Sequence, residues 1–171
     1  MRERDFYFYL CKRFMTADYP EYIKFSGIKR NEIVSVDCSL FPYKERKEYD
    51  EKHILAPDEQ VLAVKYIKCK KEIKNLLNLD GFEFCGFDLA EGGDEYYHCA
   101  GTSSLTNCGN NTFEKAFTDK DLNKYGLLDS IEKAFKIKML MPKFYPEESH
   151  AYCAVFAIWR KTYIVDSLQK I

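Results

Sequence analysis

The residues best suited to chemistry gather between Gly81 and Thr112, where the sequence reads GFEFCGFDLAEGGDEYYHCAGTSSLTNCGNNT. A cysteine and a histidine within hydrogen-bond reach of each other could form a thiolate–imidazole pair, the nucleophile of many hydrolases. Cys85, His98 and Cys108 are the candidates for such a centre. An active thiolate also needs surroundings that stabilise an anion. Because this stretch is acidic, it would raise a thiol pKa, so a cysteine- or carboxylate-dependent hydrolase stands as the alternative interpretation.

The same stretch also offers metal ligands, namely Cys85, His98, Cys99 and Cys108. Structural zinc sites usually bring their ligands in close pairs two to four residues apart. The adjacent His98 and Cys99 would instead point to opposite faces of a strand. The carboxylates follow no EF-hand spacing, and neither a P-loop nor a G-x-G-x-x-G motif occurs. The sequence therefore predicts no metal and no cofactor.

Charge sets this stretch apart from the rest of the chain. Residues 81–112 contain five acidic side chains and no lysine or arginine, whereas each flank carries a formal charge of +2 and the whole chain −1. Carboxylates grouped on a surface attract a cationic protein and form charge-assisted hydrogen bonds once it has docked. Tyrosines beside them would act as rigid anchors. The predicted partner-binding residues are Asp88, Glu91, Asp94, Glu95, Tyr96 and Tyr97, with Ser103, Ser104 and Asn107 as lesser polar contacts.

Length and composition indicate a single domain, 1–171, in a reducing compartment. No apolar run approaches the ~20 residues that span a bilayer. The apolar run Phe6–Leu10 is shorter than the roughly 7–15 residues of a secretory signal. The seven cysteines are odd in number and form no C-x-x-C pair, which is typical of buried thiols in the cytosol. We therefore expect a cytoplasmic protein that does not contact a membrane.

Alternating and β-branched patterns predict strands over 5–12, 32–40, 82–89 and 152–165. Gly86 indicates a bulge within the third of these, and the fourth, apolar on both faces, is expected in the centre of the sheet. Residues 91–94 are expected to form a turn, and 95–100 either a strand paired back on 82–89 or an irregular segment.

Two helices are expected beside the strands. Pro57 followed by Leu62, Tyr66 and Cys69 at helical spacing predicts a helix over 57–77. A capping box of Asp129 and Glu132 predicts a second helix that ends before Pro142. Together the patterns predict an α+β fold, a mostly antiparallel sheet with flanking helices.

The phrase CGFDLAEGG…SSLTNCG, followed by LNKYGLL and HAYCAVFAIWR, resembles small cytosolic immunity proteins of bacterial polymorphic-toxin and contact-dependent growth-inhibition systems. The likeness covers residues 84–160 and matches 86–89 and 103–109 to the framework and its adjoining loop. It implies a protein without catalytic residues that binds and neutralises the toxin domain of a cognate effector, often a nuclease. The expected partner is therefore a basic toxin domain, with no direct contact to nucleic acid. Two modes stay open: the acids occupy a basic cleft, or an exposed strand edge accepts a strand from the toxin.

Overall fold

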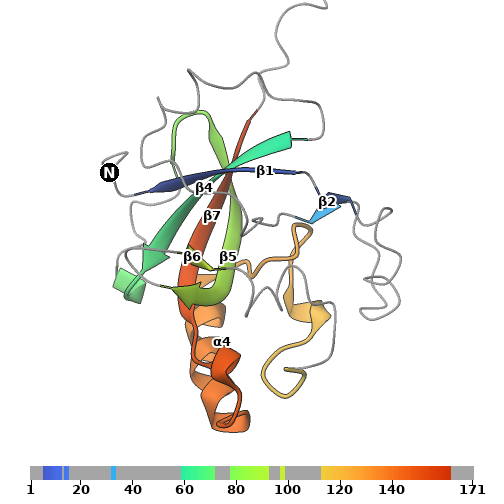
Figure 1. Ribbon diagram of the computed structural model, residues 1–171, viewed down its shortest axis with the longest axis vertical. Helices are drawn as coiled ribbons and strands as arrows, with labels where there is room; N and C mark the ends of the chain where they lie inside the picture. Colours follow the sequence, from blue (N-terminus) through green and yellow to red (C-terminus); the bar gives the residue numbers. More distant parts are fainter. Residues whose placement is uncertain are drawn as a thin grey trace, which may run out of the picture.

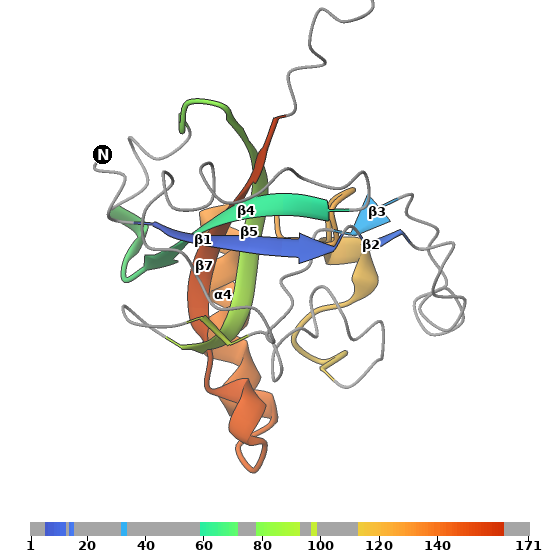
Figure 2. The ribbon, with the colours of Figure 1, turned by 45° about the horizontal axis from the view of Figure 1, so that its top comes forward.

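The computed structural model describes residues 6–12, 14–15, 32–33, 59–71, 78–92, 97–98 and 113–162. Within them lies a twisted antiparallel sheet of strand order β1-β4-β7-β5-β6, with helix α4 against one face (Figure 1). Figure 2 shows the same sheet from a second direction. The α+β fold predicted from the sequence is confirmed. Most of the strand expected over 32–40 and the loop expected over 103–111 lie outside the described residues.

The sheet strands are β1 (Tyr7–Lys12), β4 (Glu59–Ile67), β5 (Phe82–Gly92), β6 (Tyr97–His98) and β7 (Ala154–Lys161). Two short strands, β2 (Phe14–Met15) and β3 (Glu32–Ile33), pair separately. The strands predicted over 5–12, 82–89 and 152–165 are confirmed, with β5 longer and β7 shorter than expected. Strand β7 pairs with β4 on one side and β5 on the other, so its predicted central position is also confirmed.

The helix predicted over 57–77 is wrong, because residues 59–67 form strand β4. Leu62 and Tyr66, four residues apart, share a face in a helix and equally in a strand, whose side chains alternate with period two. The odd-numbered Val61 and Ile67 distinguish the two structures, since both are fully buried on the opposite face. A strand buried on both faces reads as a nearly continuous apolar run, which imitates a helix.

Both faces of the sheet are packed. On the face that bears α4, Val61, Val155 and Trp159 are fully buried together. The opposite face buries Leu62, Val64, Phe156 and Ile158, joined by Leu127 from the segment before α4. Each fully buried large side chain of this kind contributes on the order of 1.5–3 kcal/mol.

Helix α4 (Ile131–Phe144) packs Ile131, Ala134, Ile137 and Met141 against the sheet. Its N-cap is Ser130, whose hydroxyl accepts a hydrogen bond from Lys133 N at 3.2 Å, so the predicted start at Asp129 is one residue early. The predicted end before Pro142 is also wrong. Pro142 lies in the last turn, where its missing N–H removes a single helical hydrogen bond. The turn closes through Tyr145 N and Met141 O.

Gly86 produces the predicted bulge in β5. The register with β7 shifts between Phe84 and Gly86, whose φ is +141°. One extra residue places Phe84 and Phe87 on the same face, three positions apart, with ring centroids at 5.1 Å. A Cβ at position 86 would lie 2.6 Å from Leu128 O and 2.9 Å from Leu127 Cβ. Only glycine therefore allows this close approach of two backbones.

We expect Gly86→Ala to lower the free energy of unfolding by roughly 2–5 kcal/mol, because it adds both backbone strain and a collision with a carbonyl. Denaturant unfolding followed by circular dichroism measures the change. Gly81→Asn is the matched control, since asparagine tolerates its φ of +75°. The control should lose less than about 1 kcal/mol. Equal losses for both variants would contradict the close-packing explanation.

Candidate functional site

The acidic segment is held at its start by a short hairpin at one end of the sheet. Glu91 pairs with His98 and Gly92 with Tyr97, so β5 and β6 bracket residues 93–96. The expected turn over 91–94 therefore needs correction, because Glu91 and Gly92 belong to strand β5. The alternative of a strand within 95–100 is confirmed for Tyr97–His98. The pairing fixes the points at which the acidic connection leaves and rejoins the sheet.

Asp88 does not belong to a partner-binding surface. It is fully buried, and its Oδ1 accepts a hydrogen bond from Leu89 N at 2.9 Å. Asp88 pairs in register with Phe156 of β7, and because both faces of the sheet are packed, a side chain at this position is buried. A buried carboxylate is retained only with hydrogen bonds, so Asp88 is a structural residue of the sheet.

The remaining predicted contacts divide into two groups. Glu91 and Tyr97 lie in the paired backbone of the hairpin. Six predicted contacts lie outside the described residues: Asp94, Glu95, Tyr96, Ser103, Ser104 and Asn107. The candidate site is therefore the β5–β6 hairpin, defined as residues 91–98, and Asp88 is removed from it.

A group of lysines follows strand β4 at the same end of the sheet as the hairpin. The register aligns Ile67 of β4 with Val155 of β7, and Val155 with Leu89 of β5. Lys68, Lys70 and Lys71 follow β4 and are exposed. Two strand spacings, about 10 Å, separate β4 from β5, which is about one Debye length at physiological salt. Exposed lysines therefore follow β4 at the end of the sheet where β5 leads into the acidic stretch.

The segment 123–128 closes the outer edge of β5 next to the bulge. Asn123 Nδ2 donates to Cys85 O at 2.7 Å, and its Oδ1 accepts from Tyr125 N at 2.9 Å and Leu127 N at 3.2 Å. Leu128 and Phe87 exchange two backbone hydrogen bonds of 2.8 and 2.9 Å. The backbone groups that an incoming strand would use at Cys85 and Phe87 are thus already engaged.

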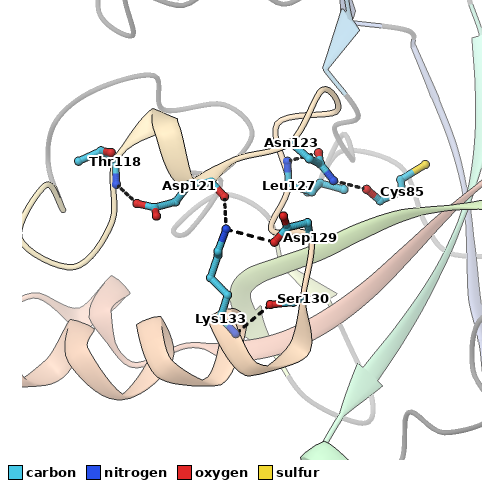
Figure 3. A network of polar contacts seen from close by, with 8 residues as sticks. All are labelled: Cys85, Thr118, Asp121, Asn123, Leu127, Asp129, Ser130 and Lys133. Carbon is cyan, nitrogen blue, oxygen red and sulfur yellow. Dashed lines mark hydrogen bonds and ion pairs between the residues drawn. The ribbon is translucent and has the colours of Figure 1, made fainter.

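A polar network holds this edge segment to α4 (Figure 3). Lys133 Nζ lies 3.1 Å from an Asp129 carboxylate oxygen and donates to Asp121 O at 3.4 Å. Asp121 in turn accepts from Thr118 N at 2.8 Å. The first turn of α4 therefore fixes the segment that covers β5.

A second contact holds the edge segment to the sheet, on the face opposite to α4. Arg160 Nε and Nη2 both donate to Glu83 Oε1, at 3.0 and 2.7 Å. The Arg160 guanidinium lies 5.2 Å from the centre of the Tyr125 ring. Glu83, one of the five acids that make residues 81–112 negative, is therefore paired with a cation of its own chain.

Sequence reasoning missed the edge segment, although the sequence contains a signal for it. Asn123 and Gly126 occupy the first and last positions of a β-turn, closed by Gly126 N and Asn123 O at 3.0 Å. Asparagine at the first position and glycine at the fourth favour a type I turn. The signal predicts the turn, but not the strand edge that it covers.

The thiol–imidazole alternative is not supported by the register. His98 pairs with Glu91, which lies six residues along β5 from Cys85. At about 3.3 Å per residue, the two positions are roughly 18–20 Å apart. The Cys85 thiol is 2% exposed and donates to Glu83 O at 3.6 Å. This separation keeps Cys85 and His98 from forming a thiol–imidazole pair. Cys108 lies outside the described residues.

In the part of the chain that the structure describes, no group of three or more histidine, cysteine or acidic residues could hold a metal ion. Burial raises the pKa of Cys153 from 9.0 to about 12, with Lys138 lowering it and Asp88 raising it. Because the thiolate is the nucleophile, Cys153 is unreactive at neutral pH.

Asn123→Ala should cost about 1–3 kcal/mol of folding free energy, because it leaves the Cys85 carbonyl and two turn amides without their partner. Urea denaturation gives the value. Lys124→Ala, an exposed neighbour in the same turn, is the control and should change stability by less than about 0.5 kcal/mol. If the two variants unfold alike, Asn123 does not pin the edge segment.

Thiol reactivity should follow burial. We expect a maleimide at neutral pH to modify the exposed Cys69 quickly, and Cys85 and Cys153 only as the protein unfolds. Peptide mass mapping over time identifies each site, and the same reaction in denaturant gives the intrinsic rates. Fast modification of Cys85 in the folded protein would revive the hydrolase interpretation.

Comparisons with known proteins found no relative of this chain. No family model matches the sequence, and no curated protein or solved structure matches it either. Among the helices described, none has the length and apolar character needed to cross a bilayer.

Proposed function

We propose that this protein is a non-catalytic inhibitor, a cytosolic immunity protein that binds and neutralises a basic toxin domain through its β5–β6 hairpin. One observation supports the proposal above the others. Within residues 81–112, which contain no lysine or arginine, the paired strands β5 and β6 bracket residues 93–96 at the end of a sheet buried on both faces. A charged segment anchored in this way loses less entropy on docking than an unattached one.

The two modes of inhibition differ in what they would require at β5, the strand that leads into the hairpin. Addition of a toxin strand to β5 would require displacement of Leu128 from Phe87 and of Asn123 from Cys85. Contact through carboxylates at the hairpin requires no such displacement. The proposal is therefore occlusion of a cationic surface of the toxin, such as the cleft in which a nuclease holds phosphates.

Mixed charge at this end of the sheet also orients the partner. A cationic toxin would be attracted by the hairpin and repelled by Lys68, Lys70 and Lys71 on the side of β4. The contact is therefore expected to extend from the hairpin away from β4, beyond the edge that β5 and β6 form. Like-charge repulsion of this kind is a common source of specificity.

The test reverses the charge of the hairpin. Glu91→Lys, Asp94→Lys and Glu95→Lys made together should weaken binding to the toxin domain encoded next to this gene at least ~100-fold, about 2.7 kcal/mol. Calorimetry with the purified toxin domain gives the affinity, and survival of cells that express the toxin gives the protection. Circular dichroism establishes that the variant is folded.

The matched control reverses three exposed acids elsewhere, Asp80→Lys, Glu114→Lys and Glu132→Lys. It has the same change in net charge and should bind within ~10-fold of the wild type, because only long-range steering is affected. A hairpin variant that binds as tightly as the control would show that the hairpin is not the contact surface. Failure of the wild-type chain to bind or protect would overturn the function itself.

A further inference from the structure

We draw no further inference here: the strongest candidate, the exposed stripe of Lys136, Met139 and Lys143 on the outer surface of α4, offers a single exposed apolar side chain, and nothing in the structure shows what covers it.

Discussion

The close approach of two backbones at Gly86 is the constraint on which the described structure depends. Without a side chain at this position, Leu128 can pair with Phe87 while Asn123 reaches Cys85 O. The bulge changes which face each later residue of β5 occupies, so it places Phe87 and Leu89 on the face that bears α4 and Asp88 on the other. One residue without a Cβ thus closes the edge of the sheet and sets the start of the acidic hairpin.

The edge segment connects this constraint to the rest of the fold. Asn123 ties the segment to β5, Lys133 ties it to α4, and the ring of Tyr125 rests on Arg160 of β7. A strand edge left open invites pairing with other chains. The edge segment engages backbone groups of β5 next to the bulge, and we propose that the hairpin recognises its partner through charge.

The sequence predicts much of this fold and less of the site. Aromatic and alternating patterns identify β1, β5 and β7, and Gly86 identifies the bulge. They fail for β4, because spacing of four residues suits both helix and strand and burial on both faces removes the alternation. The face on which Asp88 lies depends on the extra residue in a bulge, and the partner of Glu83 is Arg160, 77 residues along the chain. Patterns of neighbouring residues predict neither the face on which Asp88 lies nor the ion pair between Glu83 and Arg160.

We propose that the carboxylates of the β5–β6 hairpin bring a cationic toxin to this protein. The most direct measurement is the rate of association with the toxin domain as a function of salt, by stopped-flow fluorescence. The account predicts an association rate that falls steeply with ionic strength while the dissociation rate changes little. An association rate that does not depend on salt would contradict it.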